Sequence, residues 1–347
     1  MIFVDGVPIP SSASSSSFQE GTATALVSLM AHPDLVSASD NFKSTPERKI
    51  SNSEVDGPKP RKYVYVFQRE YATVDPALVD FVGTDEATTC VGVAIRNSRN
   101  GRTSVSHMDS PNVVDAGIRQ MLFLLDTNDD VSEFDVHLVG GYEDVCYKQR
   151  HGTRSASHGK TDGFSFPLCS KIIETLQKNH RRFNIRTLFI LHHNTRSDPD
   201  GNRRPIFNGF VVETKSGSIV PASFCRSMRC PDNIVRGVRV SSSYEDPNWE
   251  GKLLETYDTL SDRFVIASCI WTSRQVKYSM ILQDLPDSEI LRTCSTSPSA
   301  EGPDFVETLR RQWKYLIQNP DWRGTFPNKK SRVFKRSPEG SWVRCAE

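Results

Sequence analysis

One cysteine and one histidine in this chain could form a catalytic pair. The stretch 83–110, GTDEATTCVGVAIRNSRNGRTSVSHMDS, holds Cys90 after a run of small polar residues and His107 seventeen positions later. A cysteine attacks as its thiolate, which a nearby histidine stabilises by accepting the proton. The alternative is a buried thiol and a structural histidine, because free cysteine is among the residues most often buried in protein cores.

The segments around this pair can bring it together. Residues 90–97 alternate apolar and small side chains, residues 98–102 contain an Asn-Gly turn, and residues 103–108 return as a second strand. This pattern predicts a β-hairpin. A hairpin returns His107 to the start of the strand that follows Cys90, so we expect the two side chains to be neighbours.

The rest of the sequence does not predict a metal or cofactor site. The eight cysteines are scattered without a CxxC motif. His192 and His193 fall in an expected strand, where adjacent side chains point to opposite faces and do not share one metal. We therefore expect no metal and no cofactor. The basic stretch 328–336, NKKSRVFKR, favours a solvated tail over nuclear import or nucleic-acid contact.

Composition limits the class of protein. The chain has 347 residues, 37% of them hydrophobic and 24% charged, which is ordinary for a globular protein. Its net charge of +1 gives no overall attraction to nucleic acid or to an anionic membrane, and we expect neither partner. The longest apolar runs are far shorter than the roughly 20 residues of a membrane span. The N-terminus lacks the pattern of a secretory signal, so the expected location is the cytoplasm or nucleus.

The predicted elements favour a single α+β domain over residues 1–347. Strands and hairpins outnumber helices, so we expect a layered sandwich of largely antiparallel sheets with helices packed on the outside. The expected strands and hairpins are 1–9, 62–74, 134–142, 185–194, 206–224 and 252–271. The expected helices are 24–38 with a break at Pro33, 113–126, 169–179 and 303–319. A mobile linker is expected at about 43–61, and surface insertions at about 148–163 and 196–205.

Five ordered motifs carry a resemblance to a known family. They are LMAHPDL, GTDEATTC, NGRTSVSH, VHLVGGY and STSPSAEGPDFVETLR, and they span most of the chain. Together they resemble the protein N-terminal asparagine amidohydrolases in their plant-like form. The cysteine-histidine arrangement is also similar to that of bacterial chemoreceptor deamidases and of deamidating cytotoxic necrotizing factor toxins, which supports His107 as the partner of Cys90.

The resemblance implies an enzyme that converts an N-terminal asparagine of a protein to aspartate and releases ammonia. Cys90, in the ATTC motif, is the implied nucleophile, held as a thiolate by His107 and acylated to a thioester. The implied partners are proteins with N-terminal Asn, and the product then enters arginyl transfer and the N-degron degradation route. No apolar face demands self-association, so a monomer is expected. The backbone N–H of Thr89 or Cys90 is expected to stabilise the oxyanion.

Selecting a chain terminus requires a group that binds the free α-ammonium. A buried carboxylate suits this task, because an internal asparagine would leave it unpaired. Asp85, Glu86 and Glu301 are the candidates, and the alternative for each is a solvated acid or a helix cap. Thr84 and Thr88 are expected to orient His107 or the substrate amide, or to serve only as turn residues.

Two other functions fit the same residues. One is action on N-terminal glutamine, because one methylene separates the two side chains and a pocket discriminates that by only about 1–3 kcal/mol. The other is a non-catalytic adaptor that captures chain termini. Peptide binding that survives the loss of Cys90, without ammonia release by the intact protein, would identify the adaptor.

Overall fold

The computed structural model describes residues 1–9, 25–51, 61–125, 132–144 and 163–345. One helix covers residues 25–30. The other described α-helices are α2 (Pro33–Ser44), α3 (Val114–Leu125), α4 (Ser165–Lys178), α5 (Asn233–Ser243), α6 (Ser273–Leu282), α7 (Asp287–Cys294) and α8 (Phe305–Gln318).

Two large sheets form the centre of the described molecule. The first, in spatial order, contains β15 (Leu254–Glu255), β5 (Glu70–Val74), β8 (Thr103–Met108), β7 (Val91–Asn97), β9 (Glu133–Tyr142), β10 (Arg182–Leu191), β1 (Ile2–Val4) and β2 (Val7–Pro8). The second contains β3 (Arg48–Ile50), β14 (Ile219–Phe224), β13 (Phe210–Glu213), β6 (Phe81–Thr84) and β4 (Tyr63–Tyr65). Most neighbouring strands are antiparallel, which confirms the predicted α+β class.

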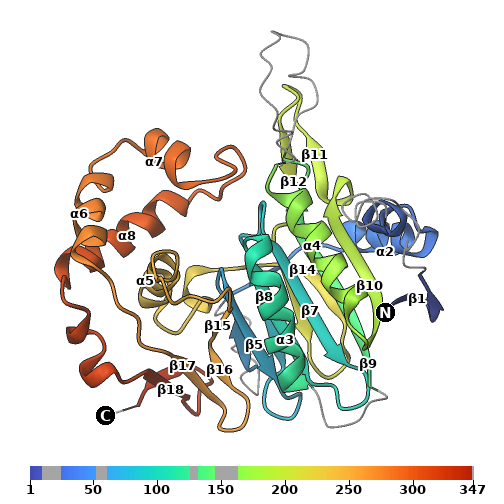
Figure 1. The fold of residues 1–347 in the computed structure, drawn as a ribbon, viewed down its shortest axis with the longest axis horizontal. Coiled ribbons are helices and arrows are strands. Elements are labelled where there is room, and N and C mark those ends of the chain that lie inside the picture. Colours follow the sequence, from blue (N-terminus) through green and yellow to red (C-terminus); the bar gives the residue numbers. More distant parts are fainter. Residues whose placement is uncertain (10–24, 52–60, 126–131, 145–162, 346–347) are drawn as a thin grey trace.

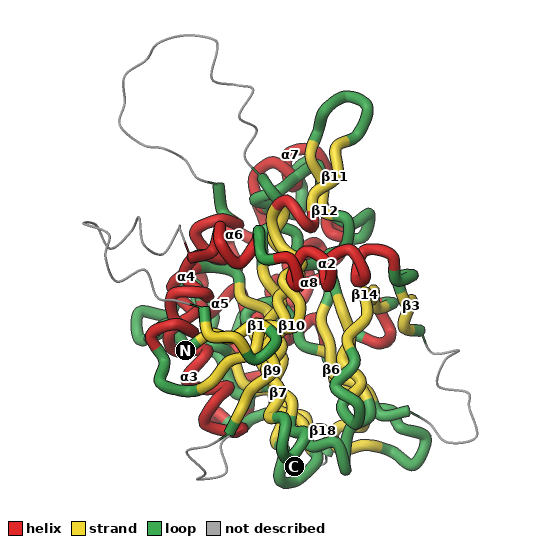
Figure 2. The backbone as a smooth tube through the Cα atoms, turned by 90° about the vertical axis from the view of Figure 1, so that its right-hand side faces the viewer, coloured by secondary structure: helices red, strands yellow, loops and turns green. Residues whose placement is uncertain are grey.

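Smaller sheets complete the strand list. One contains β16 (Tyr257–Asp258), β17 (Arg263–Ile266), β18 (Arg332–Arg336) and β19 (Trp342–Arg344). The other is the hairpin of β11 (Thr195–Ser197) and β12 (Arg203–Pro205). Figures 1 and 2 show the sandwich with α3 and α4 on one side, and α5 to α8 gathered beside it.

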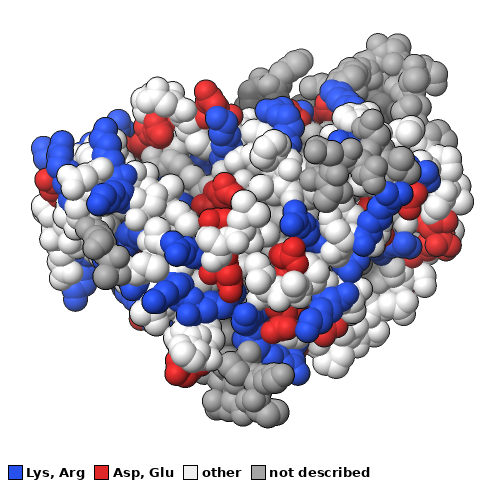
Figure 3. Space-filling model, turned by 90° about the horizontal axis from the view of Figure 1, so that it is seen from below, with Lys and Arg blue, Asp and Glu red and all other residues white. Residues whose placement is uncertain are grey.

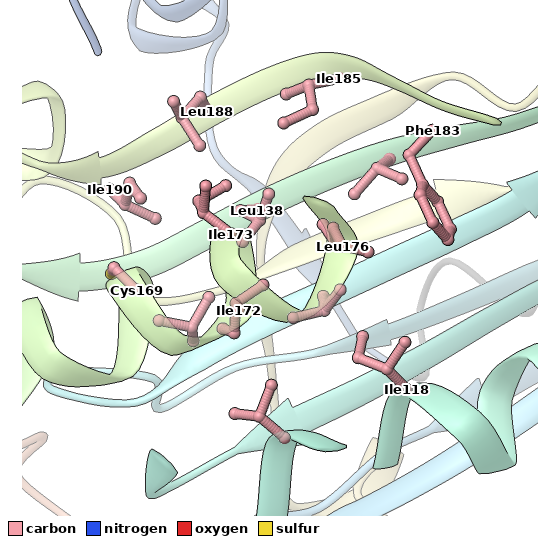
Figure 4. Close-up of a cluster of buried hydrophobic side chains, with 14 of the residues drawn as sticks. Ile118, Leu138, Cys169, Ile172, Ile173, Leu176, Phe183, Ile185, Leu188 and Ile190 are labelled. Atoms are coloured by element: carbon pink, nitrogen blue, oxygen red, sulfur yellow. The ribbon is translucent and has the colours of Figure 1, made fainter. Parts of the chain in front are cut away.

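The main core lies between the first sheet and helices α3 and α4. Figure 4 shows Ile172, Ile173 and Leu176 of α4 directed at side chains of β9 and β10, with Ile118 of α3 nearby. These α4 residues recur at helical spacing and are fully buried. Each such side chain contributes about 1.5–3 kcal/mol through burial. The opposite face of the first sheet packs on the second sheet, so the hairpin β7–β8 lies in the middle of the sandwich.

The stretch predicted as one strand over 62–74 is two strands in different sheets. β4 belongs to the second sheet and β5 to the first, and Arg69 between them has a left-handed backbone with φ 62°. No glycine or proline marks this turn in the sequence. The side chain of Glu70 stabilises it instead, because its carboxylate accepts a hydrogen bond from the N–H of Phe67 at 3.0 Å.

Other local predictions need correction. Part of the expected linker 43–61 is ordered, because Arg48–Ile50 forms β3 beside β14. The expected basic tail is strand β18, which pairs with β17 and β19. His192 and His193 lie in a 3₁₀ turn after β10, and their rings contact each other with centroids 4.3 Å apart.

The structure also bears on the predictions for the surface insertions, the first strand and Pro33. The expected surface insertion 196–205 contains the β11–β12 hairpin, and the expected first strand is split into β1 and β2 by a turn at Asp5 and Gly6. The expected insertion at about 148–163 lies outside the described residues except for Gly163. The helix break predicted at Pro33 is confirmed, because α2 begins at that residue.

The described surface carries both signs of charge. On the face seen in Figure 3, basic and acidic side chains are interspersed. None of the helices in the described ranges has both the length and the apolar character needed to cross a membrane.

Candidate active site

Cys90 and His107 lie on one face of the β7–β8 hairpin. In the register of this strand pair, Gly92 is opposite His107 and Val91 is opposite Met108. Alternate residues of a strand share a face, so Cys90 shares the face of Gly92 and hence that of His107. The two side chains are therefore diagonal neighbours across the strand pair. The predicted hairpin is confirmed.

The shared face looks into the space between the two sheets. A Cβ on Gly92 would lie 2.5 Å from the ring of Phe210 on β13 and 3.0 Å from Cγ2 of Thr84 on β6. Only glycine fits at this position, because any side chain would overlap those atoms. His107 and Thr84 are buried here, whereas Cys90 is half-buried at the end of the hairpin.

One nitrogen of His107 is held and the other is unused. Nδ1 lies 2.8 Å from Oγ1 of Thr84. Nε2 is buried and has no hydrogen-bond partner among the described residues. Burial lowers the pKa of His107 to about 4, although the carboxylates of Asp109 and Glu70 act in the opposite direction. The imidazole is therefore neutral at physiological pH.

The Cys90 thiol is also held in its neutral form. Burial raises its pKa most, and the carboxylates of Asp109 and Glu301 raise it further. The Arg69 guanidinium and the Thr89 hydroxyl lower it, but their effect is smaller. The site without substrate thus favours a neutral thiol beside a neutral imidazole, in place of the thiolate expected from the sequence.

The VHLVGGY motif holds the backbone of the cysteine. The N–H of Gly141 donates a hydrogen bond to the carbonyl oxygen of Cys90 at 2.7 Å. A Cβ on Gly140, which has φ 122°, would lie 2.6 Å from that same oxygen. The backbone N–H groups of Thr89 and Cys90 donate no hydrogen bond to any described residue. Both remain available as donors beside the thiol.

The two threonines of the ATTC motif, Thr88 and Thr89, contact a segment more than two hundred residues away. Oγ1 of Thr89 lies 2.7 Å from Oγ1 of Thr296, and Ser297 donates a hydrogen bond to Oγ1 of Thr88 at 2.8 Å. The segment 295–304 between α7 and α8 therefore packs on the cysteine loop. This places the STSPSAE motif beside the proposed nucleophile.

Glu301 of that motif is part of the site. Its carboxylate accepts hydrogen bonds from the hydroxyls of Ser295 and Ser297, the latter at 3.3 Å. Burial raises the pKa of Glu301, and these two hydrogen bonds partly oppose the shift. Its charge also acts on the pKa of Cys90, so the fold brings this sequence candidate close to the thiol.

Asp85 and Glu86 are turned toward an arginine. Asp85 is 3% exposed and accepts hydrogen bonds from the Tyr65 hydroxyl at 2.8 Å, the Phe224 N–H at 2.7 Å and Arg229 at 3.1 Å. Glu86 forms an ion pair with the same guanidinium. Arg229 thus pairs with both acids at once, although its single positive charge does not balance both carboxylates. These contacts anchor the cysteine loop to the second sheet.

Sequence reasoning missed Asp109, which lies where the hairpin register would place a partner opposite Cys90. Its side chain is 3% exposed. One oxygen, Oδ2, accepts hydrogen bonds from Arg69 at 3.0 Å, from Gln68 at 3.4 Å and from the Tyr244 hydroxyl. The other oxygen, Oδ1, is buried and has no partner among the described residues. Its place two residues after His107 was the available sequence signal.

Among the described residues, no three His, Cys, Asp or Glu side chains lie close enough together to hold a metal ion. The side-chain groups around Cys90 that could act as metal ligands are hydroxyls, one imidazole and two carboxylates. This set suits acyl transfer through a thiol.

Comparison with known proteins gives one consistent family. Residues 53–344 match the family model described as protein N-terminal asparagine amidohydrolase. The chain is 56% identical to the protein N-terminal asparagine amidohydrolase of Arabidopsis thaliana, over 99% of this chain and 100% of that protein. It is 28% identical to the mouse protein and 27% identical to the human protein of the same name, each over 86% of this chain and 89% of the relative.

Proposed function

Because the chain belongs to the protein N-terminal asparagine amidohydrolase family, we propose that it hydrolyses the side-chain amide of an N-terminal asparagine through a thioester on Cys90. The observation that carries the mechanism is the pairing within the hairpin. Cys90 shares a face with His107, whose Nε2 is buried and has no partner within the described part of the chain. An unpaired basic nitrogen beside a thiol is the arrangement that general-base activation requires.

The first step starts from the neutral pair. Nε2 of His107 accepts the thiol proton while the sulfur of Cys90 attacks the amide carbon of the substrate side chain. A C–S bond forms, and the electrons of the C=O double bond move to the oxygen. Proton transfer during attack avoids a buried thiolate in the free enzyme, which the raised pKa of Cys90 disfavours.

The oxyanion then collapses. The N–H groups of Thr89 and Cys90 are the proposed donors to it, and such donors supply a large part of the stabilisation in acyl transfer. His107 returns its proton to the departing nitrogen, the C–N bond breaks and ammonia leaves. Water next attacks the thioester with His107 as the base, the C–S bond breaks, and the thiol regains its proton as aspartate is released.

Thr84 acts as a positioning residue in this scheme. Its hydroxyl lies 2.8 Å from Nδ1 and holds the ring plane, and in the proposed tautomer Nδ1 carries the proton and donates it to this hydroxyl. Nε2 is then an acceptor at the start of the reaction. The sequence-based expectation that Thr84 orients His107 is kept as part of the proposal.

The remaining residues of the site are proposed to contact substrate. Glu301 lies near the thiol and accepts hydrogen bonds from two serines, so its carboxylate suits the amide nitrogen of the substrate asparagine. Thr88 and Thr89 shape the same wall through their contacts with Ser297 and Thr296.

The test is ammonia release, with product mass, from peptides that begin with Asn, begin with Gln, or carry Asn internally. We expect turnover of the Asn-leading peptide by the intact protein and none by Cys90→Ala. Preferred turnover of the Gln-leading peptide would replace the proposed substrate. Peptide binding by both proteins without ammonia release would support the adaptor alternative and overturn the proposal.

In the cell, we propose that the enzyme acts on free protein N-termini in the cytoplasm or nucleus as a monomer. Its product, an N-terminal aspartate, would be a substrate for arginyl transfer and degradation by the N-degron route. A reporter that begins with Asn should be stabilised when the gene is deleted, and one that begins with Asp should not. Equal half-lives of the Asn reporter with and without the enzyme would contradict this placement.

A further inference from the structure

The carboxylate of Asp109 is only half used in the structure. All three of its donors, Arg69, Gln68 and Tyr244, contact Oδ2. Oδ1 is buried without a partner among the described residues, although the side chain is 3% exposed. A buried carboxylate oxygen without a donor is costly, and such an oxygen indicates a group that is still to be bound.

The position of this carboxylate is rigidly set. Arg69, which holds Oδ2, also donates a hydrogen bond to Ser243 at 3.1 Å and lies over the rings of Tyr244 and Trp249, at 3.6 and 4.3 Å from their centroids. Its backbone N–H donates to the carbonyl of His107 at 2.9 Å. These contacts hold the arginine in place, and its hydrogen bond to the aspartate uses Oδ2 and leaves Oδ1 without a donor among the described residues.

In the free enzyme, the negative charge of Asp109 disfavours ionisation of the Cys90 thiol. Asp109 raises the pKa of the Cys90 thiol and also raises that of His107, and it is the largest contributor to the Cys90 shift after burial. Glu301 also raises the Cys90 pKa, while Arg69 lowers it. Negative charge next to the thiol disfavours the developing thiolate, so a cation bound at Asp109 would make attack easier.

We propose that Oδ1 of Asp109 binds the α-ammonium of the substrate, and that this ion pair both selects a free chain terminus and activates Cys90. The inference rests on the proposed function and deepens it. An internal or acetylated asparagine carries no cation at this place. Such a substrate leaves the carboxylate unpaired and the thiol in its inhibited state.

The other acids near the loop fit this role less well. Both oxygens of Asp85 already accept hydrogen bonds, and Glu86 is ion-paired with Arg229. Glu301 accepts hydrogen bonds from two hydroxyls, and neither of its oxygens is a buried atom without a partner among the described residues. To reach the enclosed Oδ1, the ammonium must displace a neighbour, and Tyr244 is the one that extends into solvent, at 54% exposed.

The test compares Asp109→Asn with the matched control Glu301→Gln, since each removes one carboxylate that acts on Cys90. Two quantities are measured: kcat/KM for an Asn-leading peptide with a free or an acetylated terminus, and the pH at which the Cys90 thiolate forms, from its ultraviolet absorbance relative to Cys90→Ala. Both variants should ionise the thiol at lower pH than the intact protein does.

The two variants should differ in substrate selection. In Asp109→Asn, kcat/KM for the free terminus should fall about 100-fold and the preference over the acetylated peptide should largely vanish, although its thiol ionises more easily. Glu301→Gln should keep that preference. Asp109→Glu should restore part of it, and Asp109→Ser replaces the asparagine variant if that fails to fold.

Two results separate the possible failures. If the intact protein turns over the Asn-leading peptide and Asp109→Asn keeps the full preference for a free terminus, the inference is wrong and the proposed function stands. If Glu301→Gln alone loses the preference, Glu301 is the ammonium-binding residue. If the intact protein releases no ammonia, the proposed function itself has failed.

Discussion

His107 and His137 lie on strands β8 and β9, which flank β7 in the same sheet. Each has Nδ1 beside a threonine hydroxyl, at 2.8 Å from Thr84 for His107 and at 3.0 Å from Thr187 for His137. Burial is the main cause that lowers the pKa of each to about 4. By sequence type, partner and pKa, the two imidazoles are nearly equivalent.

The two histidines differ in whether a nucleophile shares their face of the sheet. Nε2 of His107 is buried without a described partner and shares its face with Cys90. His137 is instead paired across the ladder with Ala94, which offers no reactive atom. Burial and a threonine hydroxyl thus give both histidines a neutral, oriented imidazole. The adjacent thiol is what allows His107 to act as a base.

The largest expected effect is loss of the thiol itself. Cys90→Ala should reduce kcat by at least about 10³-fold, because no other nucleophile replaces the sulfur. Cys169→Ala is the control, since Cys169 is a fully buried thiol of α4 that packs in the main core. That variant should lower the unfolding midpoint and keep kcat within about twofold. Equal losses of kcat in both variants would mean that the effect is structural.

The histidines give the next largest contrast. His107→Gln should reduce kcat by about 10²–10⁴-fold, the range for loss of a general base. His137→Gln should change kcat by less than about tenfold while it lowers the free energy of unfolding. Steady-state kinetics with urea unfolding of both variants measures the two effects. A similar loss of kcat in His137→Gln would mean that the two histidines do not differ in their role in catalysis.

A smaller contrast is expected at the threonines. Thr84→Val should reduce kcat by about 10–30-fold with little change in KM, because the ring is less well oriented but the substrate contacts remain. Thr187→Val should leave kcat unchanged. Thr84→Ser keeps the hydroxyl and should restore most of the rate, so failure of that rescue would argue against a positioning role.

The pH dependence of activity follows from the same pKa. The mechanism needs neutral His107, so kcat/KM should fall as pH drops through about 4 and not through the ordinary histidine value of about 6.5. A pH profile of kcat/KM over the range in which the protein stays folded checks this. An acid limb centred near 6.5 would mean that His107 is not shielded as the structure has it.

The smallest expected effect is on the pH dependence of the free energy of unfolding. Both histidines have folded pKa values of about 4, below the unfolded value, so unfolding takes up protons and stability is lost as pH falls from about 6.5 toward 4. Each histidine should cost about 2 kcal/mol between neutral pH and about pH 5. Urea unfolding of His137→Gln should therefore show a smaller acid loss than the intact protein shows.

The sequence predicted the local part of this site. The Asn-Gly turn and the alternation on either side predict the hairpin, and the hairpin alone brings His107 to Cys90. The class of fold and helices α3, α4 and α8 follow from periodicity in the same way. These features depend on contacts between residues close in the chain.

The contacts that the sequence did not reveal join residues far apart in the chain. Asp85 precedes the cysteine loop, and its carboxylate pairs with Arg229, 144 positions away. Asp109 acquires its role from Arg69, whose left-handed turn carries no glycine or proline signal. Neither pairing has a local pattern from which it could be read.

The proposed mechanism depends most on the covalent step at Cys90. The direct measurement is the intact mass of the protein after rapid acid quench of a reaction with an Asn-leading peptide. A thioester mechanism predicts a transient adduct equal to the peptide less one ammonia, located at Cys90 by fragmentation and absent from Cys90→Ala. Turnover of the peptide at full rate with no such adduct, or an adduct at another cysteine, would contradict it.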